Sequence, residues 1–364
     1  MAREGPVAMK SHIYLDHAAT TPVLPAAINA MAAAAALPGN PSSVHAAGRA
    51  ANGLMETSRD AIAAALGCTP EQIIFTSGGT EALALAIQGS GLPLIASATE
   101  HSAVLAARDD VVIAPVLPSG LIDLNALERL LKSGPALVAV QAGNNETGVL
   151  QPLADVAALT HRHDGLLLAD CVQSAGKQPL PDGADFIAIS GHKLGAPMGI
   201  GALIARDPAR LHPVQRGGGQ ERGHRGGTPN LPGIAALAAA LSQPHDWAAV
   251  AARRAALEAR LTAAGAIIHG AAAPRLPHIS SIGLPGMAAS TQVMRLDLDG
   301  FMVSAGAACS SGKVKTSHVL SAMGLGAAAG EAIRISLSPA TTDAELNAFA
   351  AAWAALATRL GNRS

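Results

Sequence analysis

The chain has 364 residues and a formal net charge of −1, from 25 lysines and arginines against 26 acidic residues. A length of this order predicts about two domains. The neutral charge and the 2% aromatic content argue against a nucleic-acid partner, which needs a basic face and often aromatic stacking platforms. Hydrophobic residues make up 49% of the chain, which excludes a disordered protein.

Signals for membranes and metals are weak. No apolar run is long enough for a transmembrane helix, and residues 1–10 lack the apolar core of a signal peptide. We therefore expect a cytoplasmic protein without a membrane partner. The three cysteines, Cys68, Cys171 and Cys309, are an odd number and lie far apart. This spacing predicts neither a disulfide framework nor a cysteine-based metal site, and we expect no metal.

Short aliphatic runs alternate with Ala/Leu-rich helical patterns between residues 73 and 205. Each run is apolar on both faces and is bounded by glycine, proline or a polar residue, as in a parallel sheet that helices cover. The predicted strands are residues 73–76, 92–96, 111–114, 137–141, 166–170, 186–190 and 200–205. Strands and helices in alternation indicate an α/β fold.

A glycine-rich stretch at residues 216–227 interrupts this pattern. The elements predicted beyond it are two helices on either side of Pro244 within residues 233–261, strands at 279–283 and 333–337, and a closing helix at 343–360. We expect a large domain at residues 15–250 and a smaller domain formed by residues 1–14 and 251–364.

Lys193 and Asp170 each follow or end a buried apolar strand, at the edge where open α/β sheets bind ligands. A partly desolvated lysine forms Schiff bases with carbonyl compounds, and a buried carboxylate keeps a pyridine nitrogen protonated. A surface lysine and a helix-capping aspartate are the plainer interpretations of the two residues. Neighbouring side chains that add polar groups to the same edge are Gln173, Ser190, His192 and Asn145.

Other candidate residues also have two interpretations. Gly79 and Thr80 join a strand to a helix, where backbone N–H groups hold a phosphate, although a Gly-Gly turn is usually only a turn. His101 suits stacking on a cofactor ring and proton transfer, or an ordinary loop position. Cys309 stands among small residues and is either a mobile nucleophile or an incidental thiol. Arg334 suits a substrate carboxylate or a structural ion pair.

Taken together, these residues resemble the class V family of pyridoxal 5'-phosphate enzymes, and within it the cysteine desulfurases of the NifS/IscS type. The resemblance extends over nearly the whole chain in nine blocks that keep the family's order. The blocks are residues 15–21, 39–45, 75–81, 99–101, 144–148, 170–177, 190–193, 217–222 and 308–309. One block is weak, but nine in sequence are specific.

The resemblance implies fold type I of these enzymes, in which helices flank a mostly parallel seven-stranded sheet and a smaller α+β domain carries the catalytic cysteine. It implies that Lys193 binds the cofactor covalently and moves the substrate Cα proton, that His101 stacks and handles protons, and that Cys309 accepts sulfur. The implied cofactor-binding residues are Lys193, Asp170, Gln173, Asn145, Thr80, Gly79, Ser190, His192 and Thr228. The implied substrate-binding residues are Arg334, Asn40 and Asn145.

The implied reaction converts L-cysteine to L-alanine and leaves a persulfide on Cys309 for a sulfur-acceptor protein, with an iron–sulfur scaffold as one candidate. Thr228 resembles a threonine that reaches the partner subunit's phosphate site, which implies a homodimer with a shared active site. Lys313 and Lys315 depart from the family's acidic or neutral pattern, and a C-terminal extension that binds scaffolds is expected to be absent after Ser364. The acceptor therefore stays open.

Alternative functions also stay open. Selenocysteine lyase is one, and other class V activities such as an aminotransferase are a second group. A non-catalytic partner subunit with the same fold is a third alternative, although the retention of Lys193 and Asp170 disfavours it.

Overall fold

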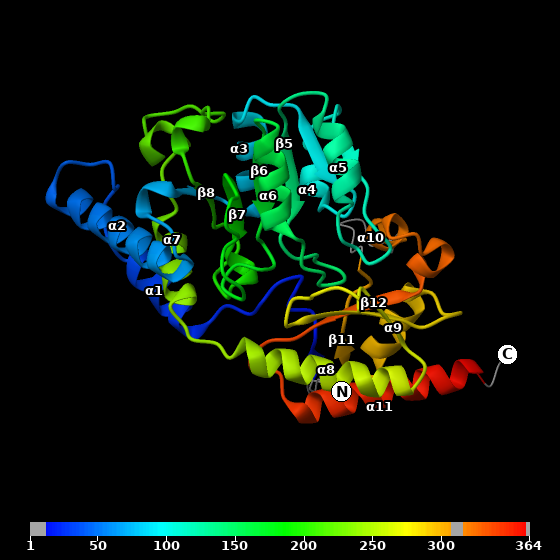
Figure 1. Ribbon diagram of the computed structural model, residues 1–364. Coiled ribbons are helices and arrows are strands. Elements are labelled where there is room, and N and C mark those ends of the chain that lie inside the picture. The colour runs from blue at the N-terminus through cyan, green and yellow to red at the C-terminus, as the bar shows by residue number, and fades with distance from the viewer. Residues whose placement is uncertain (1–11, 307–315, 362–364) are drawn as a thin grey trace, which may run out of the picture.

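A computed structural model describes residues 12–306 and 316–361. Its centre is a seven-stranded sheet in the order β2-β8-β7-β6-β5-β3-β4 (Figure 1). The strands are β2 (Ile73–Thr76), β3 (Leu94–Ser97), β4 (Val112–Ala114), β5 (Leu137–Gln141), β6 (Leu166–Asp170), β7 (Phe186–Ser190) and β8 (Gly201–Ala205). All seven strands predicted from the sequence are confirmed, with ends shifted by two residues at most.

The sheet is mostly parallel, as predicted. Strands β3 to β7 pair in parallel, whereas β8 is antiparallel to both of its neighbours, β7 and β2. Because β8 reverses the direction, β2 again runs the same way as β7. The carboxyl ends of β2 to β7 therefore meet at one edge, where ligands bind in sheets of this kind.

Side chains alternate between the two faces of the sheet with the strand period of two. In β5, Val138 and Val140 join the hydrophobic cluster on one face, and Leu137 and Ala139 join the cluster on the other. The second face is covered by α3 (Gly79–Gly89) and α4 (Ser102–Leu105). The helices packed in the first cluster are α1 (Pro25–Ala35), α2 (Ala46–Leu66), α5 (Leu124–Leu131), α6 (Leu153–Arg162) and α7 (Leu231–Leu241).

A smaller α+β unit lies beside the carboxyl edge of the sheet (Figure 1). It contains a three-stranded antiparallel sheet in the order β12-β10-β9 and a parallel pair of β1 and β11. Its strands are β1 (Ile13–Tyr14), β9 (Ile267–His269), β10 (Ile279–Gly283), β11 (Phe301–Met302) and β12 (Ala332–Ser336). Its helices are α8 (Trp247–Ala263), α9 (Ala289–Leu298), α10 (His318–Ala322) and α11 (Asp343–Gly361).

Helices α8 and α11 lie side by side below the small sheets, and Phe349 and Trp353 of α11 are fully buried there. The predicted break at Pro244 falls between α7 and α8. Helix α11 begins with a capping box, because the backbone N–H of Glu345 donates to Thr342 and that of Thr342 donates to Glu345. The predicted domain boundaries stay a prediction. No helix in the described ranges is long and apolar enough to cross a bilayer.

A buried ion pair fastens the glycine-rich stretch to the sheet. Arg59 of α2 and Glu221 form an N–O contact of 3.0 Å, and both side chains are only 3% exposed. The Glu221 carboxylate also accepts the backbone N–H of Phe75 in β2 at 2.8 Å. The Arg59 guanidinium lies 4.4 Å from the centre of the Phe75 ring. This arrangement holds the loop against the strand that leads to α3.

We expect Glu221→Ala to lower the free energy of unfolding by up to about 3–5 kcal/mol, because the substitution leaves the buried Arg59 cation with only the exposed carboxylate of Glu56 as its partner. Urea unfolding followed by circular dichroism measures the loss. The matched control is Asp110→Ala, which breaks the exposed pair with Arg108 and should leave the free energy of unfolding nearly unchanged. Equal losses for the two variants would contradict the structural role given to Glu221.

Candidate active site

A cavity of about 350 Å³ opens at the carboxyl edge of the large sheet, between this sheet and the smaller unit. The cavity is lined by residues at the ends of β5, β6 and β7, at the start of α3 and in β12. The sequence-predicted residues on the wall are Lys193, His101, Asp170, Gln173, Asn145, Thr80, Gly79, Ser190, His192 and Arg334. The structure therefore brings most of the predicted site together from six separate segments of the chain.

Lys193 lies in a short 3₁₀ turn, Gly191–Lys193, directly after β7. Its Nζ atom donates hydrogen bonds to the backbone oxygens of Ala18 and Ala19, both at 2.6 Å. Burial and the nearby Arg334 guanidinium together lower the pKa of Lys193 to about 8. The amine therefore loses its proton at a pH where an ordinary lysine stays charged, which makes it a stronger nucleophile near neutral pH.

Asp170 is the last residue of β6 and is only 7% exposed. Its Oδ1 atom accepts the backbone N–H of Val172 at 2.9 Å. Burial raises the pKa of Asp170 to about 6. The neighbouring Glu100 is fully buried, and burial together with the charge of Asp170 raises the pKa of Glu100 well above its ordinary value. A cationic group in the cavity would be stabilised by an ionised Asp170.

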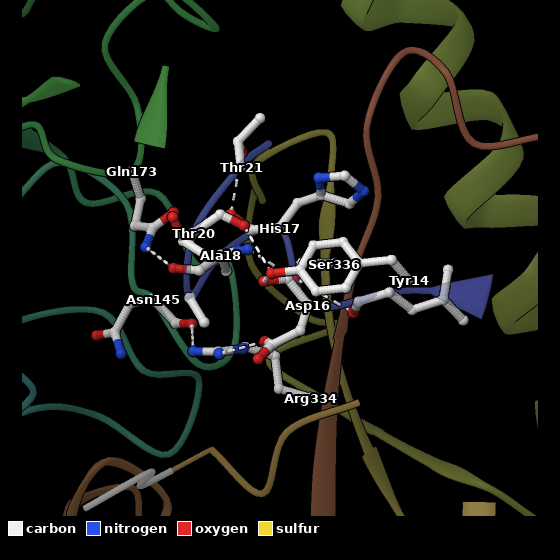
Figure 2. A network of polar contacts seen from close by, with 12 residues as sticks. Tyr14, Asp16, His17, Ala18, Thr20, Thr21, Asn145, Gln173, Arg334 and Ser336 are labelled. Carbon is white, nitrogen blue, oxygen red and sulfur yellow. Dashed lines mark hydrogen bonds and ion pairs between the residues drawn. The ribbon is translucent and has the colours of Figure 1, made fainter. Parts of the chain in front are cut away.

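The N-terminal segment Tyr14–Thr21, which contains a turn at residues 17–19, runs between Gln173 and Arg334 (Figure 2). Its Ala18 and Ala19 line the cavity. Gln173 donates from Nε2 to the Ala18 oxygen at 2.8 Å. Its Oε1 atom is buried and has no hydrogen-bond partner among the described residues. A ligand with a donor group would satisfy this oxygen, because buried polar atoms rarely stay unpaired.

Arg334 extends from β12 toward the same segment. Its Nη2 atom pairs with Oδ1 of Asp16 at 2.7 Å, and its Nη1 atom donates to the Asn145 backbone oxygen at 3.0 Å (Figure 2). The side chain is 5% exposed, and its Nε–H has no partner in the described part of the chain. The guanidinium thus keeps unused donors at the cavity wall, as a carboxylate-binding arginine requires.

The start of α3 forms a cradle of small residues. A Cβ atom on Gly79 would come within 2.7 Å of the Val172 side chain, so only glycine fits without movement. The N–H groups of a first helical turn have no partner within the helix and hold anions. Thr80, Ser190 and His192 line the same wall. Burial, together with the charge of Lys193, lowers the pKa of His192 to about 4.

His101 stands at the N-terminus of α4. Its Nδ1 atom accepts the backbone N–H of Ala103 at 3.1 Å, so the neutral ring carries its proton on Nε2. Burial lowers the pKa of His101, and the charges of Lys193 and His318 add to this effect. The ring is therefore neutral at neutral pH and offers an N–H donor on Nε2.

Three predicted site residues are not among the wall residues of this cavity. Asn40 is exposed and accepts the backbone N–H of Ser42 at 2.9 Å. Thr228 is exposed and lines a separate small hollow with Arg225. Cys309 lies outside the described residues, as do Lys313 and Lys315. The described residues contain no cluster of metal-ligating side chains.

Sequence reasoning missed two carboxylates that shape the site. Asp16 pairs with Arg334, and Glu100 lies beside Asp170 and accepts the backbone N–H of His101 at 3.2 Å. Both stand inside motif blocks, but neither received a role. The available signal was an acidic residue among small or apolar neighbours, which is costly to bury without a cationic partner.

Comparisons with known proteins confirm the resemblance. The Aminotransferase class-V family matches residues 13–349. A curated cysteine desulfurase from Cereibacter sphaeroides is 40% identical over 364 aligned positions, covering 92% of this chain and 93% of the relative. The solved NifS-like protein from Rickettsia africae ESF-5 is 34% identical with a TM-score of 0.85, covering 94% of this chain and 98% of its own. A structure of SspA in complex with cysteine is 31% identical with a TM-score of 0.78, covering 90% and 99%.

The match to NifS-like structures also confirms the predicted fold type I of pyridoxal phosphate enzymes. Both conclusions rest on nearly the full length of the chain. The protein is therefore a member of the class-V aminotransferase family, and its relatives include cysteine desulfurases and NifS-like proteins.

Proposed function

We propose that this protein is a pyridoxal phosphate-dependent cysteine desulfurase, which converts L-cysteine to L-alanine and retains the sulfur as a persulfide on Cys309. The observation that carries the proposal is the single cavity that joins Lys193, Asp170 and Arg334. A lysine of lowered pKa, a buried carboxylate and an arginine with unused donors are the groups that this chemistry needs.

The residues present fit pyridoxal 5'-phosphate, the cofactor of this family. The unpaired Gln173 oxygen can accept a hydrogen bond from a polar group of the cofactor ring. The small Gly79 at the start of α3 leaves room for the phosphate. We propose that Lys193 holds the aldehyde carbon, Asp170 the ring nitrogen and His101 one ring face. When bound, the cofactor withdraws electrons from the substrate Cα. The proposed phosphate and ring contacts are Thr80, Gly79, Ser190, His192, Gln173 and Asn145.

Substrate binding falls to Arg334 in this proposal. Its unused N–H groups face the cavity and suit the carboxylate of an amino acid. Asp16 and the Asn145 backbone fix the guanidinium plane, so that it is oriented before substrate arrives. The side chains of Asn40 and Asn145 complete the proposed substrate set, although the Asn40 side chain, as the structure describes it, accepts a hydrogen bond from Ser42 and is not on the cavity wall.

Proton transfer is assigned to the Lys193 amine and the His101 ring. A neutral Lys193 amine accepts the proton from the substrate Cα, and its lowered pKa makes this form available near neutral pH. His101 has the opposite role in this proposal, and its Nε2–H donates a proton. Both groups line the same cavity, which supports their cooperation.

Cys309 is proposed as the sulfur acceptor because Gly306, three positions before it in the sequence, lines the cavity. Three residues of chain span at most about 11 Å. In the proposed transfer, the Cys309 thiolate forms an S–S bond with the substrate sulfur. The substrate C–S bond breaks with its electron pair left on carbon, and this carbon takes up a proton to give alanine.

We further propose a homodimer in which Thr228 reaches the partner subunit's phosphate site. Its exposed position away from this chain's own cavity supports that arrangement. An acceptor protein takes the sulfur, and an iron–sulfur scaffold is one such acceptor. A cytoplasmic location completes the proposal, since a reducing compartment keeps the Cys309 thiol free.

Mass spectrometry after brief exposure to L-cysteine tests the function directly. We expect one added sulfur on the peptide that contains Cys309, with alanine formed in equal amount. Cys309→Ala should abolish sulfur transfer and keep the absorbance of the bound cofactor, whereas Lys193→Ala should abolish both. Alanine without added sulfur would indicate a lyase that releases sulfur directly, and activity only with selenocysteine would indicate a selenocysteine lyase.

The lowered pKa of Lys193 predicts how pH controls cofactor capture. Only the neutral amine attacks an aldehyde, so the rate of pyridoxal phosphate binding to the apoprotein should rise with pH and level off above about 8. Stopped-flow absorbance measures this rate. A rate that keeps rising up to pH 10.5, the ordinary pKa of a lysine, would show that the cavity does not lower the pKa of Lys193.

Arg334→Lys should raise the KM for L-cysteine by about 10–100-fold, with a smaller effect on kcat, because a lysine cannot form the paired hydrogen bonds of a guanidinium. Steady-state alanine formation gives both constants. Arg253→Lys is the matched control, since Arg253 forms a peripheral pair with Asp343 at 3.7 Å. An unchanged KM in Arg334→Lys would remove Arg334 from the substrate site.

A further inference from the structure

A second cavity, of about 220 Å³, shares Lys193 with the first. It lies between α7, the start of α8, the N-terminal segment and residues 337–340 after β12. Most of its wall is apolar, and the apolar side chains include Pro22, Leu24, Leu194, Leu241, Trp247 and Leu337. Nothing in the proposed desulfurase chemistry uses this space.

Every titratable side chain on the wall of this second cavity is basic. They are His17, Lys177, Lys193, His245 and His278. Lys177 is only 9% exposed, and its Nζ atom donates to the Lys193 backbone oxygen at 3.2 Å. The same atom lies 5.6 Å from the centre of the Trp247 ring. No acidic side chain in the described ranges forms an ion pair with Lys177, and burial together with the charge of Lys193 lowers the pKa of Lys177 to about 7. An anion bound beside this amine would favour its ammonium form.

His278 adds unused hydrogen-bonding capacity to the same wall. Its side chain is 2% exposed, and neither ring nitrogen has a partner among the residues that the structure describes. A neutral imidazole carries one N–H donor, so His278 has a donor without an acceptor. Nδ1 of His17 is also buried and unpaired. Buried polar groups of native proteins nearly always have a partner, which points to a missing acceptor here.

We propose that this second cavity binds a small organic monoanion, a carboxylate with an apolar or aromatic body and no amino group. The carboxylate would accept from the Lys177 ammonium and from the His278 ring, and the body would lie against Trp247 and Leu241. An amino acid is disfavoured, because its ammonium would face only basic side chains. The proposal concerns a site separate from the one that binds L-cysteine and does not depend on the proposed reaction.

Calorimetric titration of the holoprotein with benzoate tests this site, and benzamide serves as the neutral isostere. We expect saturable binding of benzoate and at least tenfold weaker binding of benzamide. Lys177→Met should weaken benzoate binding at least tenfold. The matched control, Lys132→Met, removes an exposed lysine and should bind as the unaltered protein does. The absorbance of the bound cofactor and circular dichroism check that each variant is folded.

Two further variants keep the test decisive. Ala340→Phe fills part of the cavity from an exposed wall position without changing charge, and it should also weaken benzoate binding. Arg334→Lys should leave benzoate binding in place, because Arg334 belongs to the first cavity. Absence of saturable benzoate binding, equal binding of benzamide, or loss of binding in Arg334→Lys but not in Lys177→Met would each overturn the proposal.

Discussion

The N-terminal segment Tyr14–Thr21 connects the small sheets to the edge of the large one, and its Ala18 and Ala19 line the cavity between them. Tyr14 pairs with β11, Asp16 binds Arg334 of β12, and the backbone oxygens of Ala18 and Ala19 accept from Lys193. Each contact joins residues that are far apart in the sequence. The segment therefore contacts both the arginine of the smaller unit and the lysine of the large sheet edge, which line the same cavity.

Burial controls the electrostatics of the cavity more than any single charge. It lowers the pKa of Lys193 and raises that of Asp170, so each group moves toward its neutral form near neutral pH. A ligand with a cationic nitrogen would offset the cost of burying an ionised Asp170. An electrophilic carbon on the same ligand would react with the neutral Lys193 amine. These two pKa shifts suit pyridoxal phosphate, the cofactor of this family.

Local pattern predicted the large sheet and the edge where the site lies, because each predicted strand is apolar on both faces and is bounded by glycine, proline or a polar residue. It could not predict contacts that depend on tertiary packing. Arg334 and Asp16 are 318 positions apart, and no periodicity connects them. Lys177 was visible only as part of a motif block, since its burial comes from the packing of Trp247 and neighbouring segments around it. The placement of Asn40 and Thr228 likewise follows from loops whose paths have no repeating signal.

The Asp16–Arg334 pair also explains how a buried arginine is tolerated when no substrate is bound. A guanidinium that is 5% exposed and unpaired would be costly to bury, and Asp16 supplies the permanent counter-charge. A guanidinium has five N–H donors, of which Asp16 and the Asn145 oxygen use one each. In the proposed substrate complex, the carboxylate would add to the remaining donors without displacing Asp16. The arginine would then keep its orientation, and binding energy would not be spent on reorienting it.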